Sequence, residues 1–145
     1  MNGQDRKAQE DQAMPASSLD HINIRTDNLK KMTAFYSKVL GLKKGRRPAF
    51  KFGGAWLYCG NRATVHLVEV EKQPKAKNLQ LEHFAFKAND INDTLKKLQK
   101  FGSNYETRVV PGGRIRQVHA YDPDGNHVEI AFSTREIPNP NLLRE

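Results

Sequence analysis

Two short stretches of the chain, residues 19–24 and 81–86, alternate apolar and polar side chains in the same way. Each begins with leucine, an acidic residue and a histidine, and then carries a large apolar residue at every second position. Such alternation predicts a half-buried β-strand that presents its histidine on the polar face. After each stretch, apolar residues recur at three- and four-residue spacing, which predicts an amphipathic helix. We expect these helices to end at Gly41 and Gly102.

Three further strands are expected after each helix. They cover residues 49–52, 55–59 and 64–70 in the first half, and residues 106–109, 114–121 and 127–132 in the second. The last two strands are joined by Asp-Pro-Asp-Gly at 122–125, a sequence typical of a tight turn. The order of elements therefore occurs twice. It predicts an α+β fold of two tandem βαβββ modules, residues 18–71 and 80–134, that form a curved mixed sheet around a cleft.

The length of 145 residues fits a single domain, which we place at residues 18–134. Residues 1–17 are polar and lack the apolar core of a signal peptide, so they are expected to form a disordered arm. Residues 71–78 are charged, contain a proline and show no periodicity, which indicates a linker between the modules. The C-terminal tail, residues 135–145, is expected to lie along the surface or in solvent.

Charge and composition narrow the range of partners. The net charge is +8, but the basic residues are spread along the chain and are not interleaved with aromatic residues as in a nucleic-acid groove. This distribution favours a modest attraction for anionic small molecules and no nucleic-acid partner. No apolar run approaches the roughly 20 residues of a membrane helix, so no membrane partner is expected. The single cysteine, Cys59, cannot form an internal disulfide and suits a reducing, cytoplasmic location.

The polar face of the strands should line the cleft, because the helices pack on the apolar face. Four side chains with metal-binding chemistry share this polar face. They are His21, His66, His83 and Glu129. Imidazole and carboxylate groups favour divalent ions such as Zn, Ni, Co, Mn or Fe. Four protein ligands leave one or two open positions for a substrate, as Lewis-acid chemistry requires. The pattern therefore predicts a divalent metal site.

Other residues on the same face are candidates for substrate contact and proton transfer. His119 is expected opposite Glu129, where it faces the substrate or supports a metal ligand. The candidates for substrate binding are Asn23, Trp56, Gln117 and Tyr121. For Trp56, a position in the core fits the pattern equally well. His127 stands beside the turn and is expected to be exposed to solvent.

Four segments carry a resemblance to a known superfamily. They are residues 19–22, the helix region with Phe-Tyr at 35–36 and Val-Leu-Gly-Leu at 39–42, residues 81–86, and Asp-Pro-Asp-Gly-Asn-His-Val-Glu at 122–129. With these segments, residues 18–134 resemble the vicinal oxygen chelate superfamily, which includes glyoxalase I, bleomycin-resistance proteins and extradiol dioxygenases. The resemblance implies metal ligands at His21, His66, His83 and Glu129. It also implies a homodimer in which the metal site can be shared between two chains.

The resemblance implies a metal-dependent lyase or isomerase of the glyoxalase type, with a small substrate that chelates the metal through vicinal oxygens. Glu129 is the expected base by resemblance to glyoxalase I, and His119 is a second candidate. At position 66 glyoxalase I usually has glutamate, so His66 departs from its pattern. Two alternatives stay open: an Fe(II) ring-cleaving dioxygenase, and a non-catalytic protein that binds a drug or another small molecule.

Overall fold

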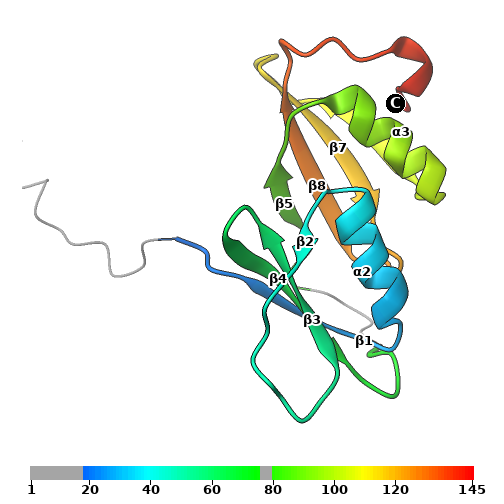
Figure 1. The fold of residues 1–145 in the computed structure, drawn as a ribbon. Coiled ribbons are helices and arrows are strands. Elements are labelled where there is room, and N and C mark those ends of the chain that lie inside the picture. The colour runs from blue at the N-terminus through cyan, green and yellow to red at the C-terminus, as the bar shows by residue number, and fades with distance from the viewer. Residues whose placement is uncertain (1–17, 76–79) are drawn as a thin grey trace, which may run out of the picture.

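The computed structural model describes residues 18–75 and 80–145, which fold as two modules (Figure 1). The first module contains β1 (Ile22–Thr26), α2 (Leu29–Lys38), β2 (Lys43–Lys44), β3 (Gly54–Cys59) and β4 (Arg62–Glu69). The second contains β5 (Phe84–Lys87), α3 (Ile91–Phe101), β6 (Tyr105–Val109), β7 (Ile115–Tyr121) and β8 (His127–Ser133), followed by the 3₁₀ turn η1 (Pro140–Leu142). Both modules thus have the order βαβββ.

The eight strands lie in two four-stranded sheets with the same topology. Their orders are β1-β4-β3-β2 and β5-β8-β7-β6. In each sheet the first strand runs parallel to the last, and the other neighbours are antiparallel. Trp56 pairs with His66 in the first sheet, and His119 pairs with Glu129 in the second. This register confirms the predicted duplication and the two-module α+β fold.

Both helices begin at a side-chain cap. The Asn28 side chain accepts a hydrogen bond from the backbone N–H of Lys31, and Asp90 accepts one from Asp93. Helix α3 ends at Gly102, whose φ of 78° is in the left-handed region, as the sequence predicted. Helix α2 ends earlier than expected, at Lys38 with Val39 as its cap.

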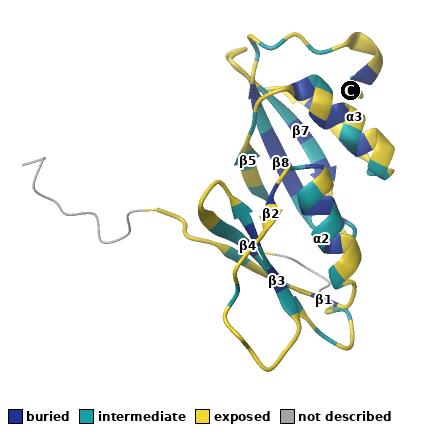
Figure 2. Cartoon of the chain, in the orientation of Figure 1, coloured by how far each residue is buried: buried dark blue, intermediate teal, exposed yellow. Residues whose placement is uncertain are grey.

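Buried residues alternate with less buried ones along most strands (Figure 2). In β4, Val65 and Leu67 are buried, and in β8 the buried apolar residues are Val128, Ile130 and Phe132. These residues belong to one hydrophobic cluster together with the inner faces of α2 and α3. The cluster extends across both modules, and a buried hydrogen bond joins them, from the Tyr36 hydroxyl on α2 to Asp122 Oδ2 after β7, at 2.8 Å.

Residues 49–52 form no strand, so that prediction was wrong. The strand next to β3 is the two-residue β2, and the intervening residues form a loop. Pro48 lacks the N–H that strand pairing needs, and glycines at 53 and 54 follow directly. Phe50 and Phe52 therefore lie exposed in this loop instead of alternating in a sheet.

The C-terminal tail packs against the second module instead of lying free in solvent. Leu142 is buried, and its carbonyl accepts a hydrogen bond from the Tyr105 hydroxyl at 2.7 Å. The Arg144 carbonyl accepts from the backbone N–H of Thr107 at 2.6 Å. The proposed N-terminal arm and residues 76–78 of the linker lie outside the described residues. Within residues 18–75 and 80–145, no helix has the length and apolar character needed to cross a membrane.

Candidate metal centre

His21 and His66 lie together on the polar side of the first sheet. Their rings are stacked, with centroids 4.0 Å apart and planes 14° apart. His21 precedes β1 directly, whereas His66 lies within β4 between Asn23 on β1 and Trp56 on β3. Trp56 stacks on His66 at 4.0 Å, so it belongs to the wall of the site and not to the core. This arrangement provides two neighbouring imidazoles on an aromatic support.

Local hydrogen bonds orient both imidazoles. His66 Nε2 lies 3.0 Å from the Ala63 carbonyl; donation to that oxygen leaves Nδ1 with a lone pair for a metal. Burial, and then the neighbouring His21, lower the pKa of His66. A lowered pKa keeps the ring neutral near pH 7, which is the form that binds metals. His21 Nδ1 lies 2.6 Å from Asp20 Oδ2, which leaves Nε2 of His21 available.

His83 and Glu129 form a second pair in the second module. His83 Nε2 lies 3.3 Å from Glu129 Oε2. Glu129 is only 8% exposed, and its Oε1 accepts a hydrogen bond from Gln117 Nε2 at 2.8 Å. His83 lies directly before β5, at the position that His21 occupies before β1. The second module thus supplies one imidazole and one carboxylate, and Gln117 orients the carboxylate.

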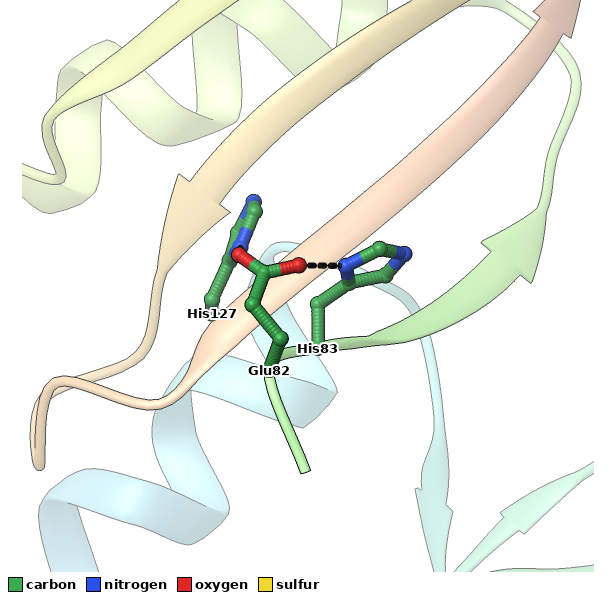
Figure 3. A group of neighbouring side chains, drawn as sticks. All are labelled: Glu82, His83 and His127. Atoms are coloured by element: carbon green, nitrogen blue, oxygen red, sulfur yellow. Dashed lines mark hydrogen bonds and ion pairs between the residues drawn. The ribbon is translucent and has the colours of Figure 1, made fainter. Parts of the chain in front are cut away.

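Glu82 connects His83 with His127 (Figure 3). Its carboxylate contacts Nδ1 of His83 through one oxygen, and Nδ1 of His127 through the other at 2.7 Å. The ligand atoms of Glu82, His83 and His127 lie within 4.8 Å of one another, the one group of three of this kind among the described residues. The second nitrogen of His127 lies 3.0 Å from His119 Nδ1.

The prediction that His127 is exposed to solvent was wrong, since its side chain is only 13% exposed. The turn before β8 sets the register Tyr121↔His127, which brings His127 onto the same face as Glu129 two residues later. The two-residue spacing from Glu129 was the signal in the sequence that identifies this position.

These contacts and burial shift the pKa values of three side chains in the second module, His83, Glu82 and His119. The hydrogen bond to Glu82 is the main cause that raises the pKa of His83. Contact with His83, and then with His127, lowers the pKa of Glu82. Burial is the main cause that lowers the pKa of His119, and its buried Nε2 has no hydrogen-bond partner among the described residues. A neutral His119 with a free ring nitrogen can accept a proton.

Histidines line a hollow in each module of the described structure. His83 and His119 line a cavity of about 440 Å³ together with Tyr121, whereas His21 and His66 line another of about 510 Å³. The four predicted ligands are therefore brought together as two pairs, one in each module. Of the predicted substrate contacts, Trp56 lies at the first pair and Gln117 holds Glu129 of the second pair.

The donors fit a divalent metal ion. Three imidazoles and a carboxylate form a nitrogen and oxygen set that suits Zn, Ni, Co, Mn or Fe(II). In each pair a ring nitrogen or an oxygen is already held by a neighbouring group, which is the support that metal ligands usually have. The Glu82, His83 and His127 cluster offers a second donor set within the second module.

The sequence of the chain is similar to that of known proteins. The sequence profile of the Glyoxalase/Bleomycin resistance protein/Dioxygenase superfamily matches residues 18–130. The chain is 29% identical over 131 residues to a metapyrocatechase of Geobacillus stearothermophilus, covering 82% of this chain but only 38% of that protein. It is 26% identical over 119 residues to a lactoylglutathione lyase of Escherichia coli O157:H7, covering 76% and 88% of the two chains.

The fold also resembles solved structures of this kind. The glyoxylase/bleomycin resistance protein/dioxygenase domain from Frankia superposes with a TM-score of 0.68 at 17% identity, covering 81% of this chain and 93% of that one. Its similarity is one of fold alone. Because the superfamily profile matches more than half of the sequence, the chain belongs to the Glyoxalase/Bleomycin resistance protein/Dioxygenase superfamily.

Proposed function

We propose that two copies of the chain pair so that His21 and His66 of one copy meet His83 and Glu129 of the other around a divalent metal ion. The observation that carries this proposal is the division of the four donors into two pairs: the His21 and His66 rings stack at 4.0 Å, and His83 Nε2 lies 3.3 Å from Glu129 Oε2. Each pair alone offers two ligands, whereas both together offer four and leave positions open for a substrate. A symmetric dimer would form two equal sites.

The proposed activity is that of a lyase or isomerase that moves a proton on a small substrate with vicinal oxygens. When bound, the metal ion would polarise these oxygens and stabilise the negative charge that develops on them. Glu129 is the proposed base, since Gln117 holds one of its oxygens and the other faces His83. His119 is the proposed second base, because its lowered pKa favours the neutral ring and its Nε2 has no hydrogen-bond partner within residues 18–75 and 80–145.

The similarity to a metapyrocatechase favours a second candidate function, an Fe(II) ring-cleaving dioxygenase. Two histidines and one carboxylate with open positions are also the ligand set of non-haem iron oxygenases. Oxygen uptake with catechol under Fe(II) separates this function from the isomerase, which consumes no oxygen. If the chain is a non-catalytic binding protein, the unmodified protein shows no turnover, and the Glu129→Ala variant binds the ligand as well as the unmodified protein does.

Mixing of inactive variants tests the shared site. His21→Ala/His66→Ala and His83→Ala/Glu129→Ala are purified separately, then mixed under conditions that allow subunits to exchange. We expect each variant alone to lose metal and turnover of thiol-adduct and diol substrates. The mixture should regain both, because a mixed dimer contains one complete site and one without any of the four ligands. A mixture that stays without metal would overturn the shared site.

The Glu82, His83 and His127 cluster predicts a different outcome for the same proteins. If the metal is held there, His127→Ala removes it, while His21→Ala/His66→Ala retains it. The metal content per chain, measured by plasma mass spectrometry, therefore discriminates between the two ligand sets. The mass of the assembly is measured on the same samples. The expected result is loss in His21→Ala/His66→Ala and retention in His127→Ala.

A further inference from the structure

The loop between β2 and β3 presents two stacked aromatic rings on the surface. Phe50 and Phe52 are 44% and 48% exposed, and their rings lie 5.0 Å apart with planes 15° apart. The guanidinium carbon of Arg47 lies 4.9 Å from the Phe50 centroid and 5.2 Å from that of Phe52. Contiguous apolar side chains that are exposed to solvent are typical of binding sites.

This patch is continuous with the proposed metal site of the first module. The Phe50 ring lies 6.4 Å from that of Trp56, which in turn stacks on His66 at 4.0 Å. A hollow of about 110 Å³ lies among these rings, Arg47 and Asn23. An apolar cavity of about 150 Å³ holds benzene in another protein, so a single ring suits a hollow of this size that is open to solvent. A ligand ring here would lie next to the imidazole of His66.

The charge of the hollow is positive. Arg47 donates one hydrogen bond from Nη2 to the Phe52 carbonyl at 2.9 Å, which leaves other guanidinium N–H groups for a ligand. Within the described residues, Arg47 has no ion pair, and no acidic side chain lines this hollow. A guanidinium group of this kind recognises carboxylates and other planar anions.

The backbone keeps room for Arg47. A Cβ at Gly54 would lie 3.0 Å from Arg47 Nη2 and 2.3 Å from the Leu67 carbonyl. Glycine at the start of β3 therefore lets the guanidinium group lie against the strand, beneath the two phenylalanine rings.

We propose that Arg47, Phe50, Phe52 and Trp56 form a binding subsite for a planar aromatic anion. The ring of the ligand lies in this hollow against the phenylalanine rings and Trp56, and its acidic group pairs with Arg47. As a part of the active site this subsite rests on the proposed function: it makes aromatic acids the substrate class, with vicinal oxygens that reach the metal site at His66. Binding of the aromatic anion itself requires no metal.

Trp56 is the only tryptophan in the chain, so its fluorescence reports directly on the subsite. Metal-free protein is titrated with three ligands of similar size: benzoate, cyclohexanecarboxylate without the aromatic ring, and benzyl alcohol without the charge. We expect benzoate to quench Trp56 and to bind about fivefold more tightly than either analogue, since each lacks one of the two interactions. Equal binding of cyclohexanecarboxylate and benzoate would overturn the aromatic part of the proposal.

Variants separate the contributions of charge and rings. Arg47→Gln should weaken benzoate binding about fivefold, whereas Arg46→Gln, at an exposed neighbouring arginine, should leave it unchanged. Phe50→Leu/Phe52→Leu keeps apolar side chains but removes the rings, and about a tenfold loss is expected. Equal effects of Arg46→Gln and Arg47→Gln would show attraction by net charge alone and reject the subsite.

A second copy of the chain is the competing occupant of this patch. Sedimentation of Phe50→Leu/Phe52→Leu tests it: dissociation of a dimer with unchanged benzoate binding would show a contact between copies and overturn the proposal. The titrations are independent of the shared metal site, because they are carried out without metal. Failure of benzoate binding with intact recovery of metal in mixed variants would reject the subsite alone.

Discussion

The two modules have the same topology but offer different chemistry at equivalent positions. In the first, His66 pairs across the sheet with Trp56, and the surroundings are aromatic rings. In the second, Glu129 pairs with His119, and the surroundings are hydrogen-bonded titratable groups. At equivalent positions, the first module thus has the imidazole of His66, which stacks on Trp56, and the second has the carboxylate of Glu129, which accepts a hydrogen bond from the Gln117 amide. The two modules thus share a scaffold, and they differ in the side chains that they place at equivalent positions on it.

The largest expected effect concerns catalysis and tests whether Glu129 of the second module contributes more to it than His66 of the first. Glu129→Ala removes the proposed base and a proposed metal ligand, and it leaves the half-buried Gln117 amide without its partner. We expect kcat/KM to fall by about 10³-fold. His66→Ala removes only a proposed metal ligand, and a loss of about 10- to 100-fold is expected.

Steady-state kinetics on the substrate found by screening measure both variants, each with its metal content determined. Glu129→Gln is the matched control, because it keeps the shape but accepts no proton. A His66→Ala enzyme that is impaired as strongly as Glu129→Ala would show that the two modules contribute equally.

The next effect concerns the contact that joins the modules. Asp122 Oδ2 accepts hydrogen bonds from the Tyr36 hydroxyl and from the Asn126 side chain, and Oδ1 accepts from the backbone N–H groups of Asp124 and Asn126. Asp122→Ala removes all four, so the free energy of unfolding should fall by about 3 kcal/mol. Tyr36→Phe removes one of them and should cost about 1 kcal/mol.

Urea denaturation followed by circular dichroism gives both values. Lys97→Ala, which removes only an exposed ion pair with Asp93 within α3, serves as a control and should cost less than about 0.5 kcal/mol. Similar values for Tyr36→Phe and Lys97→Ala would mean that the buried bond contributes little to the coupling of the modules.

Most of the fold could be predicted from the sequence, because alternation and helical spacing are local signals. They identified which side of each strand is buried and which carries His66, His119 and Glu129. Residues 49–52 misled the prediction because apolar residues there alternate for another reason, to present rings at the surface. The alternating pattern indicates that such side chains point the same way, but it does not show whether they point into the core or into solvent.

The candidate site was predictable as a set of residues but not as an arrangement. Spacing along the chain identifies His21 with His83 as equivalent positions, yet it does not determine how two sheets sit relative to each other. The separation into two pairs therefore required the structure. The contact of Glu82 with His127 was missed. The repeated acidic residue before each histidine was visible in the sequence, but only the pairing of β5 with β8 brings Glu82 to His127.

Acid should distinguish the two histidine environments. The pKa of His83 is raised, mainly by Glu82, while the pKa of His66 is lowered, mainly by burial. As pH falls, His83 therefore takes up its proton first, and a metal at the second pair competes with that proton at a pH where His66 is still neutral. Below the pKa of His83, metal affinity should fall about tenfold per pH unit for this one proton.

Glu82→Gln removes the main cause of the raised pKa, so its loss of metal affinity should begin at a lower pH. Calorimetric titration with Zn at several pH values measures the shift, and NMR titration of the five histidine rings in metal-free protein assigns it. Titration of His66 above His83 would contradict this difference between the modules.

The smallest effects concern the two helix caps, which differ although their helices are equivalent. Asn28 caps α2 with an ordinary φ of −127°, so Asn28→Ala loses the hydrogen bond to the N–H of Lys31 and should cost about 1 kcal/mol. Asp90 caps α3 with φ at 63°, a left-handed conformation that costs a non-glycine residue about 1 kcal/mol or more. Asp90→Gly loses a cap but relieves this strain, so its net effect should lie within about 0.5 kcal/mol of zero.

Asp90→Ala keeps the strain and loses the cap, which makes it the matched control, and it should cost about 1 kcal/mol or more. Chemical denaturation of the three variants resolves the differences if all unfold in one transition. An Asp90→Gly protein as unstable as Asp90→Ala would mean that the side-chain bond to Asp93 outweighs the backbone strain. In that case both helices are stabilised at their start mainly by the side-chain hydrogen bond of the cap, and the caps do not distinguish the two modules.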